Sequence, residues 1–175
     1  MTGVATIAFT QTGKPKQATK TQVKKPGTSS KVLKTIKYAG SYYSGDLTIR
    51  KGSASFIDIY PETDSTILFY LDLNSGPPSF KVAHLYGRAK IINGIGSLSS
   101  KLPGNSKACM LNFTFPANSL IIKTSQGTND CAFVPGVTAD GTYKKQSPKI
   151  PPFFLGPKGD SNYFHKISPE KYYKQ

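Results

Sequence analysis

Short segments in which apolar and polar residues alternate, each bounded by turn residues, constrain the fold of this chain more than any other feature. STILFYLDLN (residues 65–74) and ACMLNFTF (residues 108–115) each place a row of large apolar side chains on one face. About eight such segments lie within residues 38–145, and none has a convincing helical period. Regular spacing of short strands predicts an all-β fold, and closure into a small antiparallel barrel would leave no open edge.

One segment departs from simple alternation at Gly87. Before this glycine, His84 and Tyr86 share a parity that predicts an apolar, inward face. After it, the apolar residues shift parity to Ala89 and Ile91, which predicts a β-bulge at the glycine. His84 is therefore expected to be a hydrogen-bonded histidine of the core or its rim.

The net charge of +14 is divided unevenly along the chain. Residues 1–40 carry +8 with no acidic residue, residues 41–143 carry +1, and residues 144–175 carry +5. A nearly neutral centre between basic ends is compatible with a binding protein. A polyanion binder that uses its basic ends, for nucleic acid or acidic glycan, is an alternative.

The basic N-terminal segment, residues 1–37, is rich in Lys, Thr, Gln, Pro and Gly and poor in residues that pack. We expect residues 1–36 to contribute little to folding, and Lys24 and Lys25 to be candidates for polyanion contacts. Its first nine residues, MTGVATIAF, have two interpretations: the end of a secretory signal whose start is missing, or an ordinary terminus.

The C-terminal segment, residues 146–175, interleaves aromatic residues with Lys and Pro. Aromatic and basic side chains in this pattern can bind single-stranded nucleic acid. The alternative, which the apolar character of Phe153, Phe154, Tyr163 and Phe164 favours, is that this extended tail docks on the barrel. These four residues are the candidate binding residues of the tail.

The two cysteines, Cys109 and Cys131, flank a segment that resembles a hairpin. Cys109 shares its face with Leu111 and Phe113, and Cys131 shares parity with Phe133, so both thiols are expected to face apolar surroundings. A buried apolar thiol is a poor nucleophile, and the cysteine spacing does not suit zinc. A strand-to-strand disulfide is favoured over two free core thiols, and it would imply an oxidising compartment outside the cytosol.

Three stretches carry a family resemblance: YPETDSTILFYLDLNSGPPSF, LYGRAKI and NDCAFVPGVTADGTYKK. They resemble small exported proteins of Bacteroidetes-type bacteria with a compact calycin-like (lipocalin-like) β-barrel, and the resemblance covers residues 38–175, including the closing SPEKYYK. It implies export to the periplasm or beyond and carries no catalytic signature. The sequence departs from the family pattern Cys-Gly-Phe-Gly, because alanine (Ala132) and valine (Val134) replace the two glycines.

Motifs for catalysis and cofactor binding are absent from the sequence: it has no phosphate-binding loop, no dinucleotide fingerprint and no nucleophile elbow. His84 and His165 lie on different segments, and no pair of carboxylates stands out. We therefore expect no enzymatic activity, no cofactor and no metal site. No run of 18 apolar residues indicates a membrane span.

The leading functional hypothesis is an exported, non-enzymatic binding protein of the cell envelope, inhibitor-like or immunity-like, whose partner is another protein. The polyanion binder described above is the second hypothesis. The third is a carrier of a small apolar ligand inside the barrel, although the many inward Phe, Leu and Ile residues favour a filled interior.

Overall fold

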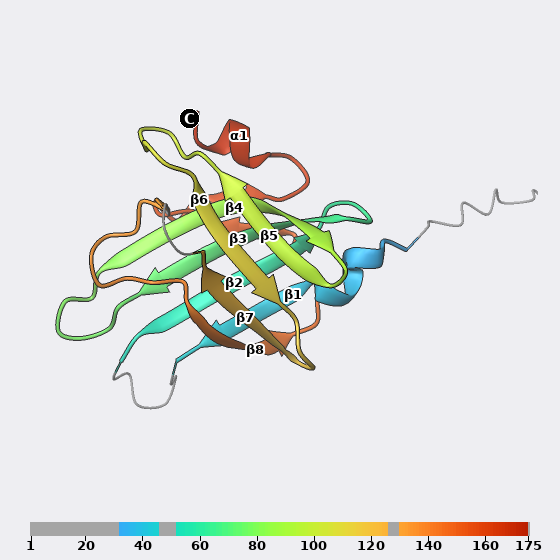
Figure 1. Ribbon diagram of the computed structural model, residues 1–175, viewed down its shortest axis with the longest axis horizontal. Coiled ribbons are helices and arrows are strands. Elements are labelled where there is room, and N and C mark those ends of the chain that lie inside the picture. Colours follow the sequence, from blue (N-terminus) through green and yellow to red (C-terminus); the bar gives the residue numbers. More distant parts are fainter. Residues whose placement is uncertain (1–31, 46–51, 126–129, 175) are drawn as a thin grey trace, which may run out of the picture. The chain divides into compact units, whose positions relative to one another are not determined.

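Eight strands form a closed antiparallel barrel in which each strand pairs with its neighbours in chain order and β8 pairs back with β1 (Figure 1). The computed structural model describes residues 32–45, 52–125 and 130–174. The predicted all-β barrel is confirmed.

The strands are short, as the spacing of turn residues predicts. The barrel consists of β1 (Gly40–Ser44), β2 (Ala54–Pro61), β3 (Thr66–Asn74), β4 (Val82–Ile92), β5 (Ile95–Ser100), β6 (Cys109–Thr114), β7 (Ser119–Thr124) and β8 (Gly141–Ser147). Outside the barrel lie the 3-10 helix η1 (Lys34–Tyr38), the hairpin of β9 (Phe153–Leu155) and β10 (Ser161–Tyr163), and the helix α1 (Pro169–Tyr172). Strand β8 thus ends two residues beyond the predicted barrel limit at residue 145.

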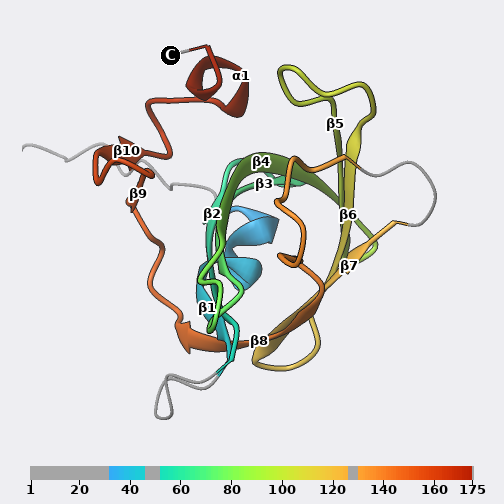
Figure 2. The ribbon, with the colours of Figure 1, turned by 90° about the vertical axis from the view of Figure 1, so that its left-hand side faces the viewer.

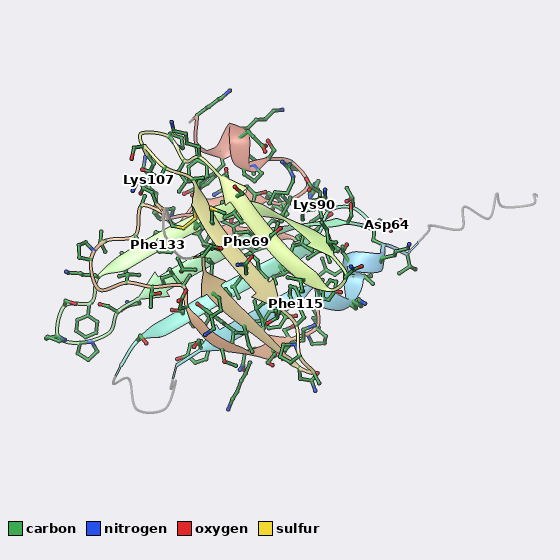
Figure 3. The ribbon with its side chains drawn as sticks, viewed as in Figure 1. Asp64, Phe69, Lys90, Lys107, Phe115 and Phe133 are labelled. Atoms are coloured by element: carbon green, nitrogen blue, oxygen red, sulfur yellow. A yellow bond between two sulfur atoms is a disulfide. The ribbon has the colours of Figure 1, made fainter. Side chains whose placement is uncertain are left out.

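The barrel interior is filled by side chains from alternate positions of the strands. Phe69 lies near the centre (Figure 3). Phe113 packs against it, with 4.9 Å between the ring centroids. The other fully buried members of this core include Ile57, Ile59, Ile67, Leu71, Leu73, Ala89, Leu111, Leu120 and Ile122. Burial of each of the Ile, Leu and Phe side chains in this core contributes about 1.5–3 kcal/mol.

The predicted bulge at Gly87 is wrong. Strands β3 and β4 pair without interruption from Thr66–Lys90 to Asn74–Val82. Gly87 itself faces inward, where a Cβ atom would lie 2.6 Å from the ring of Phe69. The glycine makes room for that ring and does not break the strand.

The side chains assigned to the interior before Gly87 point outward. Tyr86 is buried outside the barrel, in a second apolar cluster with Leu68 and Tyr70, and His84 lies on the same outer face, opposite Asp72. The apparent shift in parity arose because both faces of β3 and β4 carry apolar residues: one faces the core, and the tail covers much of the other.

Helix η1 closes one end of the barrel, which we call the η1 end. Thr35 is 1% exposed and donates a hydrogen bond from its hydroxyl to the carbonyl of Thr63. Tyr38 packs on Phe115 at 4.4 Å, and its carbonyl accepts a hydrogen bond from the hydroxyl of Tyr42. Residues 34–37 of the predicted N-terminal segment thus belong to helix η1 and to the unit that begins at Val32.

Residues 130–140, which precede β8, cross the opposite end of the barrel (Figure 2). A disulfide joins Cys109, the first residue of β6, to Cys131 in this segment, with the Cα atoms 4.3 Å apart. The favoured pairing is thus present, but it ties a strand to a loop and not to another strand. Phe133 and Val137 follow the cysteine and pack against the core, so the bond holds an apolar cover over this end.

Candidate binding surface on the C-terminal hairpin

Strands β9 and β10 form a hairpin. Because side chains alternate between the two faces of a strand, the aromatic residues of the tail are divided between the two faces of the hairpin. Phe154 and Phe164 are each 2% exposed, whereas Phe153 and Tyr163 are each 39% exposed. Phe153 is the cross-strand partner of Tyr163. The candidate tail residues therefore do not form one site, because two of them dock and two face solvent.

The docked face packs on the outer surface of the barrel beside β3 and β4. Phe154 stacks on Tyr70 at 4.1 Å and lies 4.7 Å from Tyr86. Phe164 stacks on Tyr60 at 5.5 Å. These contacts bury the aromatic rings of both partners and fix the hairpin against a rigid sheet.

Tyr173, just after α1, gives the tail a polar anchor. Strand β4 pairs with β5 only from Lys90 onward, so the backbone at Tyr86 has no strand partner from β5. The hydroxyl of Tyr173 accepts a hydrogen bond from the Tyr86 amide at 2.9 Å and donates one to the Tyr86 carbonyl at 3.0 Å. One side chain thus replaces a missing strand at this edge.

Arg88 connects the tail to the barrel by charge. Its guanidinium lies 2.7 Å from Glu62, in the turn after β2, and also contacts Glu170 in α1. Partly exposed ion pairs contribute modestly to stability. Here the bidentate contact to Glu62 orients the arginine so that it also holds the helix.

The outward face of the hairpin carries an exposed strip, which we define as Phe153, Leu155 and Tyr163. The rings of Phe153 and Tyr163 are 5.6 Å apart, and Leu155 is 57% exposed. Lys166 and His165 form the basic end of the strip. The Nζ of Lys166 lies 4.6 Å from the centroid of the Tyr163 ring, and the ring centroids of His165 and Tyr163 are 5.9 Å apart.

At Leu155 the strip meets a depression of about 290 Å³, which we call the acidic groove. Leu155 and Phe56 contribute its apolar side chains, and Phe56 is 47% exposed. Asp58 and Asp72 provide two carboxylates on neighbouring strands. Strip and groove together form a surface with an apolar centre, a basic end and an acidic end.

Asp58 is the more buried of the two carboxylates. Burial raises its pKa, and the hydrogen bond that it accepts from Ser41 at 2.5 Å partly offsets this effect. An ionised carboxylate in a half-enclosed groove is incompletely solvated, so it gains from a cationic partner more than a surface carboxylate does.

His84 contacts two residues of the acidic groove and is hydrogen-bonded, although on the outer face and not in the core. Its Nδ1 lies 3.1 Å from the hydroxyl of Tyr70 and 3.5 Å from Asp72. Burial raises the pKa of Tyr70, and the neighbouring Tyr172 and Asp72 raise it further, so this phenol stays protonated at neutral pH. The contact therefore orients the histidine ring and does not generate a phenolate nucleophile.

Lys24 and Lys25 lie outside the described residues. Within the described ranges, no group of three or more His, Cys, Asp or Glu side chains is arranged to hold a metal ion. In the same ranges, no helix has the length and apolar character needed to cross a membrane.

Sequence reasoning did not find Phe56, Asp72 or Leu155 as members of a surface. A signal for Phe56 was present, because alternation in ASFIDIY places it with Asp58 on the polar face of β2. In the structure the ring of Phe56 packs on that of Tyr43, with 4.7 Å between the centroids, and Phe56 stays 47% exposed. No sequence signal could have joined Leu155 to that face, because their proximity depends on how the tail docks.

Comparisons with protein-family models, with curated proteins and with solved structures found no match.

Proposed function

We propose that this chain is an exported, non-enzymatic binding protein, and that the exposed strip and the acidic groove form its contact surface for another protein. The observation that carries the proposal is the two-faced hairpin. One face fixes the tail to the barrel, and the other presents Phe153, Leu155 and Tyr163 to solvent.

Apolar exposure of this kind is unfavourable for a protein that has no partner. The outward positions of the hairpin could have carried polar side chains without affecting the docked face. Instead, Leu155 and Phe56 adjoin the same groove and extend the apolar area from the tail onto the barrel. Contiguous apolar patches with polar edges mark interaction surfaces, and aromatic residues dominate the energetics of such interfaces.

The charges around the surface describe the partner that would fit. A lysine or arginine of the partner would enter the acidic groove between Asp58 and Asp72, and an acidic side chain would approach Lys166. Complementary charges at the edges of an apolar centre set orientation and speed association. The chain has a net charge of +14, so an acidic groove on it is a local feature that bulk charge does not produce.

Export is supported by the disulfide between Cys109 and Cys131, because such bonds persist mainly in oxidising compartments. The resemblance to small exported calycin-like proteins agrees with this location. An inhibitor-like or immunity-like role is the most specific form of the proposal. A rigid barrel with a disulfide bond can present a preorganised surface to a single target.

The second candidate function is binding of a polyanion, and the observation in its favour is the concentration of lysines toward the two ends of the sequence. The third, transport of a small apolar ligand, has less support because buried side chains occupy the barrel interior.

The test is capture of proteins from envelope extract on the immobilised full chain, on Phe153→Ser/Leu155→Ser, and on a control, Ile92→Ser/Ile95→Ser. The control removes two residues that are also about half exposed, at the turn between β4 and β5. A protein that is retained by the parent and the control at 0.5 M salt and is lost from the strip variant supports the proposal. Equal retention by both variants, or elution by salt alone, contradicts it.

A further inference from the structure

A second depression, of about 300 Å³, lies at the η1 end of the barrel. Its described lining residues contribute two ammonium groups, three aromatic rings and no carboxylate. They are Lys37, Tyr38, Tyr42, Gly94, Phe115, Pro116, Ala117, Asn118, Ser119 and Lys145. We call it the lysine pocket, and apart from Tyr42 it shares no residue with the acidic groove.

Lys145 is built into this pocket by the barrel itself. Lys145 lies two residues after Tyr143 in β8, so its side chain is on the same, inward face of the strand. Its cross-strand partner in β1 is Tyr42. Its backbone amide donates to the carbonyl of Asn118. Its Nζ lies 5.1 Å from the ring of Tyr42 and donates to the carbonyl of Lys37 at 3.3 Å.

The ammonium group of Lys145 is incompletely solvated in this position, and burial lowers its pKa. One of its three N–H groups is used by the carbonyl of Lys37, which leaves two for a ligand. Lys37 lies over the ring of Tyr38 at 5.0 Å, so a second ring holds a second ammonium group.

The rings position the two cations and offer little stacking area to a ligand. The faces of Tyr38 and Tyr42 are each covered by a lysine, and Phe115 packs directly on Tyr38. What the pocket presents is therefore positive charge in a partly enclosed space, with Asn118 and Ser119 among its lining residues. Such a site fits an anion better than a flat base or a sugar ring.

We propose that the lysine pocket binds a compact oxyanion, a phosphate or carboxylate group, through the ammonium groups of Lys37 and Lys145. The group could belong to a free small molecule or to the end of a longer anionic chain, since the recognition chemistry is the same. This site is independent of the exposed strip, so neither proposal depends on the other.

The experiment is a titration of the full chain with inorganic phosphate and, separately, with glucuronate, at constant ionic strength, followed by the backbone amide signals of Gly94 and Asn118. The variant is Lys145→Met, which removes the charge and keeps an unbranched side chain that is one atom shorter. The matched control is Lys144→Met, which makes the same change at the neighbouring exposed lysine. Lys37→Met serves as a second variant on the exposed side of the pocket, and thermal unfolding confirms that each protein is folded.

We expect saturable shifts at both amides in the parent and in Lys144→Met, and at least tenfold weaker binding in Lys145→Met or Lys37→Met. Binding of phosphate alone or of glucuronate alone identifies the preferred oxyanion, and binding of both supports recognition by charge. The proposal is overturned if neither probe binds the parent saturably, or if Lys144→Met weakens binding as much as Lys145→Met.

Discussion

Replacing Phe154 with alanine tests how the tail is attached to the barrel. Phe154 is 2% exposed. The centroid of its ring lies 4.1 Å from that of Tyr70, 4.7 Å from that of Tyr86 and 5.1 Å from that of Phe164. Removal of a phenylalanine from such an environment costs about 3–5 kcal/mol, because the apolar transfer energy is lost and a cavity remains.

The neighbouring residue provides the control. Phe153 is 39% exposed and its main ring contact is with Tyr163, so Phe153→Ala is expected to cost less than about 1 kcal/mol. For a protein of this size, 1 kcal/mol corresponds to about 2–4 °C in Tm. Phe154→Ala should therefore lower Tm by roughly 6 °C or more, and Phe153→Ala by only a few degrees.

The assays are thermal and urea unfolding of both variants, together with amide hydrogen exchange of the barrel strands, α1 and β10. A larger loss of protection in the tail than in the barrel strands would show that Phe154 holds the tail by docking it on the barrel. Equal destabilisation by the two substitutions, or none by Phe154→Ala, would refute the assignment of opposite faces to adjacent phenylalanines.

Three further predictions concern the barrel. Reduction of the disulfide should lower the free energy of unfolding by about 3 kcal/mol, since it closes a loop with a sequence separation of 22, and unreduced protein should show a two-hydrogen mass deficit. Gly87→Ala should cost about 1–3 kcal/mol in urea unfolding because the new methyl group meets Phe69, whereas Gly141→Ala, whose Cβ would lie no closer than 3.5 Å to another atom, should be tolerated. Asp58→Asn should be more stable than the parent at pH 7: burial raises the pKa of Asp58, so the parent loses stability as pH rises through that pKa, and the gain should shrink in acid.

Alternation predicted the strands best where one face meets solvent. In β6, Cys109, Leu111 and Phe113 are buried while Asn112 and Thr114 are exposed, as the period of two requires. The same reasoning failed in β4 because the tail covers the outer face there, and a strand with two apolar faces has no distinct parity. Helix η1 was missed because five residues are too few to show a helical period.

The candidate surface was only partly accessible to sequence reasoning. The tail was identified from its aromatic residues, but Phe153 and Phe154 are adjacent, and only the pairing of β9 with β10 determines which one faces the barrel. The lysine pocket was missed for a related reason. Lys145 stands in a run of basic residues, and its environment depends on β1, η1 and the turn between β6 and β7.

The most direct test of the binding surface is the Kd of the captured partner, once purified, for the parent and for Phe153→Ser/Leu155→Ser, measured at 0.1 M and 0.5 M salt. The account predicts that the substitutions weaken binding at least tenfold at both salt concentrations, while salt alone changes the Kd of the parent little, because the centre of the surface is apolar. An unchanged Kd in the variant, or a parent Kd that rises steeply with salt, would contradict a protein-binding role for the exposed strip.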